Sequence, residues 1–179
     1  NTMGQQITLV LGGAASGKSR WAEAYTASLA SKLIYVATAQ ASDSEMKNKV
    51  AMHQNARSDL WTTYEEPLHV AQLIETFPEA HAVLIDCATM WLSNQLLAKK
   101  NLDKAYDSWI SALLTAACPI VIVSNEVGHG VVPQNALGRQ FRDAQGRLNQ
   151  RLAAAADLVV MITAGLPKVL KGQLAESRL

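Results

Sequence analysis

The chain has 179 residues, which corresponds to one domain at about 150 residues per domain. Apolar residues make up 49% of it and charged residues 17%, so it can bury a core, and a disordered or collagen-like protein is excluded. Sixteen basic and fifteen acidic residues leave a net charge of +1, which gives no overall field that would attract nucleic acid. Any anionic ligand therefore has to be held by a local site.

Cysteine spacing and hydropathy narrow the class of protein further. Cys87 and Cys118 are far apart in the sequence, so neither a disulfide scaffold nor a structural zinc site is favoured. No apolar run reaches the ~20 residues that would span a bilayer, and the N-terminus lacks the pattern of a signal peptide. We expect a soluble cytoplasmic protein, and we exclude residues 1–3 from fold reasoning as a remnant of expression.

Five short runs of apolar residues recur along the chain. They are Ile7–Gly12, Leu33–Ala39, Ala82–Cys87, Pro119–Glu126 and Leu158–Ala164. Most are nearly continuous in Val, Ile and Leu, which is typical of strands buried on both faces of a parallel sheet. Stretches of helical length separate them. The pattern therefore predicts an α/β fold, with a mostly parallel sheet flanked by helices and residues 1–179 in a single domain.

The segment between the second and third runs is longer than one crossover requires. Residues 42–57 are predicted to form a helix, because Met46, Val50 and His53 recur on one face. Residues 61–64 have the composition of a short strand. Long insertions on α/β scaffolds often carry function, so we expect residues 40–66 to be an inserted segment of the active site.

A long helix is predicted after Pro133, where apolar residues recur at helical spacing. The stripe consists of Leu137, Phe141, Ala144, Leu148, Leu152 and Ala155. The steps of 4, 3, 4, 4 and 3 residues give one continuous apolar stripe, as on the core-facing side of an amphipathic helix.

The strongest motif is G-x-x-x-x-G-K-S, which lies between the first apolar run and a predicted helix. Its glycines let backbone N–H groups close around phosphate oxygens, and the helix N-terminus adds partial positive charge. Lys18 is expected to reach the outer phosphates, and the Ser19 hydroxyl to bind Mg²⁺. The sequence therefore predicts a P-loop that binds a nucleoside triphosphate. The predicted contacts are Gly12, Gly13, Ala14, Ala15, Ser16, Gly17, Lys18 and Ser19.

Asp86 ends the third apolar run, as the acid of a Walker B strand does. Beside a P-loop, such a carboxylate can hold the Mg²⁺ shell. The alternative is that Asp86 caps the following helix, near whose first turn Thr89 lies. We favour the role in Mg²⁺ binding, because a triphosphate bound at the P-loop would bring Mg²⁺ close to Asp86.

His53 has two interpretations from its pattern alone. It shares a predicted helical face with apolar residues, which favours a structural histidine. Alternatively, its neutral imidazole attacks phosphorus, with Arg57 favouring the neutral form and binding phosphate oxygens.

Eight stretches together resemble a known family in its own order and over nearly the whole chain. They are Leu11–Arg20, Tyr35–Ala39, Glu45–Arg57, Trp61–Pro67, Leu84–Asn94, Asn125–Pro133, Phe141–Asp143 and Gly146–Ala153. The P-loop alone is generic, but Asn125–Gly128 and Gly146–Leu152 are specific. The chain resembles the bifunctional adenosylcobinamide kinase / adenosylcobinamide-phosphate guanylyltransferases of cobalamin biosynthesis.

The resemblance implies two reactions on a corrinoid. The first phosphorylates the aminopropanol hydroxyl of adenosylcobinamide with ATP or GTP. The second transfers GMP from GTP to that phosphate through a guanylylated histidine, here His53, and gives adenosylcobinamide-GDP and pyrophosphate. Mg²⁺ is the implied cofactor, and a RecA-like fold and a homotrimer are the implied architecture.

The resemblance also assigns roles by motif position. Lys18 and His53 are implied to be catalytic, Ser19 and Asp86 to bind the metal, and Asn125 and Glu126 to lie in the active site. The implied nucleotide contacts outside the P-loop are Ala37, Thr38, Ala39, Gln54, Asn55, Ala56, Arg57, Glu65 and Asp86.

Two other functions compete with this one. A single-activity P-loop kinase for another small alcohol would transfer phosphate without a covalent GMP intermediate. A RecA-like, ATP-driven nucleic-acid-binding module would need a basic surface, and the net charge of +1 counts against it.

Overall fold

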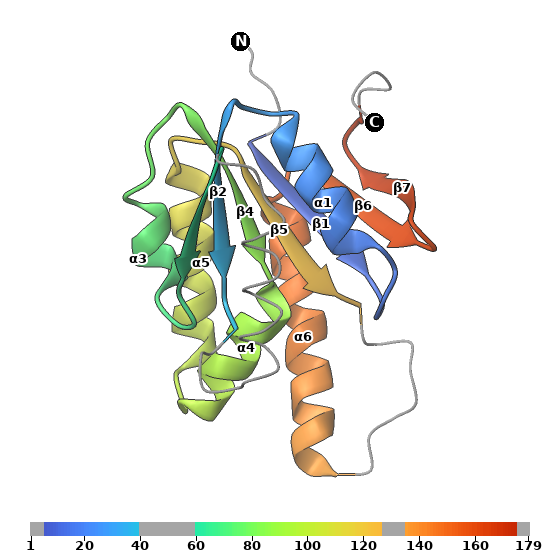
Figure 1. Ribbon diagram of the computed structural model, residues 1–179. Coiled ribbons are helices and arrows are strands. Elements are labelled where there is room, and N and C mark those ends of the chain that lie inside the picture. The colour runs from blue at the N-terminus through green and yellow to red at the C-terminus, as the bar shows by residue number, and fades with distance from the viewer. Residues whose placement is uncertain (1–5, 40–59, 127–134, 175–179) are drawn as a thin grey trace.

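The computed structural model describes residues 6–39, 60–126 and 135–174. In these residues seven strands form one sheet in the order β3-β2-β4-β5-β1-β6-β7, and only the β6–β7 pair is antiparallel (Figure 1). The predicted α/β architecture with a mostly parallel sheet is confirmed. The strands are β1 Ile7–Gly12, β2 Lys32–Ala37, β3 Trp61–Glu65, β4 His81–Asp86, β5 Ile120–Asn125, β6 Leu158–Thr163 and β7 Leu166–Lys171.

Helices cover both faces of the sheet (Figure 1). They are α1 Lys18–Ala27, α3 Val70–Ile74, α4 Ala88–Leu97, α5 Leu102–Thr115 and α6 Ala136–Ala155. α1 packs on one face and the others on the opposite face, so each face has its own apolar core. Leu9 of β1 points into one core and its neighbour Val10 into the other, and both are fully buried. This is why the central strands read as continuous apolar runs.

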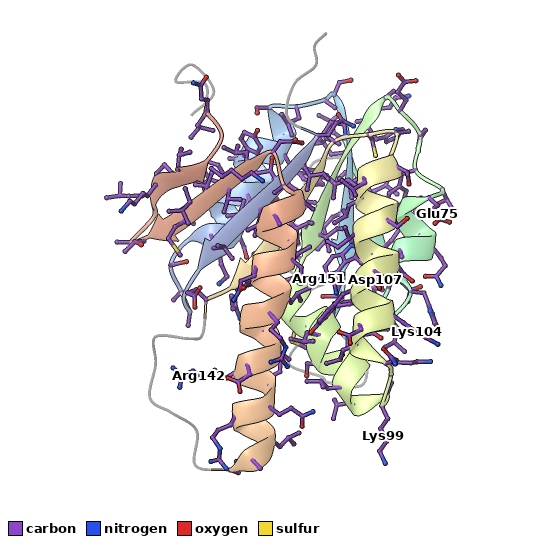
Figure 2. The ribbon with its side chains drawn as sticks, turned by 180° about the vertical axis from the view of Figure 1, so that it is seen from behind. Glu75, Lys99, Lys104, Asp107, Arg142 and Arg151 are labelled. Carbon is purple, nitrogen blue, oxygen red and sulfur yellow. The ribbon has the colours of Figure 1, made fainter. Side chains whose placement is uncertain are left out.

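The long helix α6 confirms most of the predicted stripe but not its start. Ala144, Leu148 and Leu152 are buried, whereas Leu137 is 65% exposed. The prediction for Leu137 is wrong because the first turns of α6 project beyond the sheet, where no strand covers them (Figure 1). On the back of the molecule, Arg151 of α6 forms an ion pair with Asp107 of α5 (Figure 2).

The edge strand β7 was not predicted. All six of its residues are exposed, including Leu166 and Leu170, so it lacks the buried apolar pattern of the other strands. The residues 60–66 of the expected insertion are part of the fold, because Trp61–Glu65 forms the opposite edge strand β3. Within the described residues, no helix is both long and apolar enough to cross a membrane.

Candidate active site

Five neighbouring strands bring their carboxyl ends to one edge of the sheet. Ala37 pairs with both Glu65 and Asp86, and Gly12 pairs with Asn125. Since ligands of open α/β sheets bind beyond the carboxyl ends of the strands, this edge is the candidate site. The structure thus gathers predicted residues from five separate parts of the sequence.

The phosphate loop follows β1 and is shaped by its backbone. Gly17 has a φ of 90° and is the N-cap residue of α1, and that left-handed conformation favours glycine. A Cβ on Gly12 would lie 2.9 Å from the carbonyl oxygen of Ile162, so a larger residue does not fit there. The Lys18 Nζ donates to the carbonyl oxygen of Gly13 at 3.0 Å, which holds its positive charge over the loop.

Asp86 is fixed by a tyrosine on the neighbouring strand. The Tyr35 hydroxyl donates to Asp86 Oδ2 at 2.6 Å. Cys87, not Asp86, is the N-cap residue of α4, so the alternative in which Asp86 caps that helix is wrong. Asp86 is thus held through Oδ2 by Tyr35 and does not cap α4.

The Cys87 thiol at the end of β4 is acted on by charges from both the strand end and the loop. Burial and the Asp86 carboxylate raise the pKa of the Cys87 thiol to about 11, while the Lys18 ammonium acts on it in the opposite direction. The charges of Asp86 and Lys18 therefore both act on the thiol of one residue at this edge of the sheet.

The donor set at this edge fits Mg²⁺. This ion usually keeps several waters and takes one or two protein oxygens together with substrate phosphates. Ser19 in the first turn of α1 and Asp86 at the end of β4 offer a hydroxyl and a carboxylate of that kind. In the described part of the chain no group of three or more His, Cys, Asp or Glu residues forms an all-protein metal cage.

The end of β2 is tied to β4 by Thr38. Its fully buried hydroxyl donates to the Cys87 carbonyl oxygen at 2.7 Å and accepts from the Cys87 N–H at 2.9 Å. The hydroxyl is thus used inside the fold.

Sequence reasoning gave no role to the polar residues on the inner face of α4. Asn94 is 2% exposed, and its Nδ2 donates to the carbonyl oxygens of Thr38 at 2.7 Å and Pro67 at 3.0 Å. Gln95 Nε2 and Trp91 Nε1 both donate to the carbonyl oxygen of Leu68. These side chains hold the segments after β2 and β3 together. The available signal was two adjacent amides within a mostly apolar helix.

Asn125 at the end of β5 is fixed by its backbone. Its N–H donates to Thr89 Oγ1 at 2.9 Å, and its carbonyl oxygen accepts from Asn149 Nδ2 at 3.1 Å. The next residue, Glu126, donates its N–H to the Gly12 carbonyl oxygen at 2.9 Å. Asn125 and Glu126 therefore stand directly beside the phosphate loop.

Some predicted site residues lie outside the described residues. These are His53, Gln54, Asn55, Ala56 and Arg57, together with the helix expected over residues 42–57. The described residues that flank this segment in the chain are Ala39 and Leu60.

The sequence of the chain matches a known family over most of its length. The model of the family described as cobinamide kinase / cobinamide phosphate guanyltransferase matches residues 8–170. The bifunctional adenosylcobalamin biosynthesis protein CobP of Pseudomonas aeruginosa is 42% identical over 168 residues, which is 92% of this chain and 97% of the relative. The bifunctional adenosylcobalamin biosynthesis protein CobU of Salmonella typhimurium is 41% identical over 177 residues, 89% of this chain and 97% of the relative.

Solved structures add a likeness in fold. An ATPase from the type III secretion system of pathogenic bacteria superimposes with a TM-score of 0.55 at 9% identity, over 97% of this chain and 60% of that one. This similarity shows the P-loop NTPase fold alone. The family match and the close relatives span almost the whole chain, and the chain belongs to the cobinamide kinase / cobinamide phosphate guanyltransferase family.

Proposed function

We propose that this protein phosphorylates adenosylcobinamide with a nucleoside triphosphate and then transfers GMP from GTP to adenosylcobinamide phosphate through a guanylylated His53. The observation that carries the proposal is the shared edge of the sheet, where the phosphate loop, Asp86 and Asn125 meet. Relatives about 40% identical to the chain that are named as bifunctional enzymes support it.

In the first reaction, the corrinoid hydroxyl oxygen bonds to the γ-phosphorus. The bond from that phosphorus to the β,γ-bridging oxygen breaks, the nucleoside diphosphate leaves with the electron pair, and the hydroxyl proton passes to water. The loop N–H groups from Gly13 to Ser19 and the Lys18 ammonium stabilise the negative charge on the oxygens around the transferred group. Held by Ser19 and Asp86, Mg²⁺ would further neutralise the triphosphate.

In the second reaction, His53 replaces pyrophosphate on the α-phosphorus of GTP. An imidazole nitrogen bonds to phosphorus, the bond to the α,β-bridging oxygen breaks, and pyrophosphate leaves. The corrinoid phosphate then displaces the histidine, so one difficult displacement becomes two easier ones. Residues 37–39, 54–57 and Glu65 are the proposed contacts of the guanosine. Asn125 and Glu126 are proposed active-site residues.

The proposal also covers the domain organisation of the chain, its assembly and its location in the cell. We propose that residues 1–179 act as one P-loop domain with an inserted active-site segment at 40–66, and that three chains assemble. The exposed edge strand β7, with Leu166 70% and Leu170 52% exposed, supports a contact between chains. Substrate nucleotides are abundant in the cytoplasm, which supports that location.

Trapping the covalent intermediate tests the proposal. Incubation with Mg²⁺ and GTP labelled at the α-phosphate should leave one GMP per chain, in a bond that acid cleaves and base does not, as expected of a phosphorus–nitrogen bond. His53→Ala should remove the label. His69→Ala is the matched control, because His69 is exposed and lies beside α3, outside the phosphate loop. Equal labelling of His53→Ala, or turnover by an unlabelled wild type, would refute the proposal.

A further inference from the structure

A cavity of about 500 Å³ opens beside the phosphate loop, on the side away from β2 and β3. Loop residues, the first turns of α1 and the turn between β6 and β7 line it. In the sheet order, β6 and β7 lie on one side of β1, whereas β4, β2 and β3 lie on the other (Figure 1). The lining contains none of residues 37–39, 54–57 and 65, which are the proposed guanosine contacts, so the proposed function gives this cavity no role.

The far wall of the cavity is attached to the loop itself. The N–H of Gly165, in the β6–β7 turn, donates to the carbonyl oxygen of Ser16 at 2.7 Å. A Cβ on Gly17 would lie 3.2 Å from the Gly165 Cα, so turn and loop are in close backbone contact. A ligand bound both to the phosphate loop and in the cavity would therefore contact two segments whose relative positions are fixed by these contacts.

The lining suits a nucleoside. Ala24 and Ala164 leave room, and the exposed Arg20 contributes a planar guanidinium, a group that stacks well on aromatic rings. Trp21 is 8% exposed, and its buried indole N–H has no acceptor among the described residues. The volume falls within the usual range of pockets for small organic ligands.

The stereochemistry of the two reactions requires two nucleoside positions. In an in-line phosphoryl transfer, the leaving group departs on the side opposite to the attacking oxygen. When the γ-phosphorus is attacked, the leaving group is the nucleoside diphosphate, so the nucleoside points away from the acceptor. When the α-phosphorus is attacked, pyrophosphate departs and the nucleoside stays with the transferred phosphorus. The departing group is the nucleoside diphosphate in the first reaction and pyrophosphate in the second. If the same loop holds the departing group in both reactions, the two nucleosides lie on opposite sides of the loop.

We propose that the cavity between α1 and the β6–β7 turn binds the nucleoside of the kinase donor, while the guanosine that is transferred lies toward β2 and β3. One phosphate loop then serves both reactions with the triphosphate in opposite directions. This inference rests on the proposed function, because it needs both reactions to occur on this chain.

Filling the cavity tests the inference. Ala24→Phe places a ring in it, and Ala27→Phe is the matched control, because Ala27 is also exposed on α1 but does not line the cavity. The kinase step is followed with ATP (or with GTP, if ATP is not a donor) and adenosylcobinamide. The guanylyl step is followed separately, with GTP and adenosylcobinamide phosphate. Wild-type activity in both assays establishes the proposed function before any variant is compared.

We expect Ala24→Phe to raise the KM for the kinase donor about tenfold or more and to leave the KM for GTP in the guanylyl step within twofold. Ala27→Phe should change neither. Equal changes in both steps, or no change in the kinase step, would overturn the inference. Arg20→Ala gives a second reading without added bulk, because Arg20 is exposed and its loss does not endanger folding. It should weaken donor binding in the kinase step alone, and a wild-type KM there would also count against the cavity.

Discussion

The Lys18 side chain of the phosphate loop makes its hydrogen bond to a residue close in sequence, whereas the strand ends beside the loop are held by side-chain contacts between distant residues. Within the loop, Lys18 donates to Gly13, five residues away. At the strand ends, Asn94 reaches across 56 residues to Thr38, and Tyr35 reaches across 51 to Asp86. The two regions form one site at the same edge of the sheet.

This difference predicts that the loop lysine mainly affects catalysis, whereas the strand-end residues mainly affect stability. Replacing Lys18 should remove charge stabilisation while the fold persists, because its side-chain hydrogen bond is made to Gly13 within the loop. A change at the strand ends should loosen the frame that positions the nucleotide, because buried carbonyl groups lose their donors. Loop and strand-end variants are therefore expected to differ in whether they affect activity or the free energy of unfolding.

The largest effect is expected from Lys18→Ala. Both the kinase and the guanylyl activities should fall by about 10²–10³-fold or more, because the ammonium stabilises the charge that develops on the triphosphate. The free energy of unfolding should change by no more than about 1 kcal/mol, since one partly buried hydrogen bond is lost. Steady-state rates and urea unfolding measure the two quantities. Retained guanylylation would place GTP away from this loop.

Asn94→Ala is expected to lower stability strongly and the catalytic rate only slightly. Two carbonyl groups, those of Thr38 and Pro67, lose their donor, which should lower the free energy of unfolding by about 2–4 kcal/mol. The KM for GTP should rise several-fold while kcat changes little, because no reacting atom is touched. Gln95→Ala is the matched control and should cost less, because Trp91 still donates to Leu68. Equal losses in the two variants would contradict the bridging role of Asn94.

The third prediction concerns Cys87, where the two regions meet. Its pKa of about 11 in the folded protein lies above the ordinary value of 9.0, so folding favours the neutral thiol. That contribution to stability is present below pH 9 and is lost as the pH rises through about 11. At pH 9 without Mg²⁺, alkylation of Cys87 should be about 50-fold slower in the folded than in the unfolded chain, as judged by mass spectrometry of its peptide.

Two variants sharpen this measurement because their effects have opposite signs. Asp86→Asn removes a charge that raises the pKa of Cys87, so alkylation should become faster. Lys18→Ala removes a charge that lowers it, so alkylation should become slower. Unchanged rates in both variants would show that the loop lysine and the strand acid do not share one site.

The predictable parts of the fold are those with a local signal. β1 and β5 were found from continuous apolar runs, because a strand buried on both faces carries that pattern in its own residues. β7 carries no such pattern, because all its residues are exposed. Leu137 has the spacing of a core residue yet lies where the sheet has ended, and spacing alone does not report the length of a neighbouring element.

By itself, the sequence determined the phosphate loop, the acid at the end of β4 and the alternation of strands and helices. Each depends on a few consecutive residues whose backbone or side chains act locally. Only the tertiary structure decided that Tyr35 holds Asp86, that Asn94 joins the ends of β2 and β3, and that a turn after β6 closes a cavity beside the loop. Those contacts arise when strands far apart in the chain become neighbours, and no spacing along the sequence encodes which strands will meet.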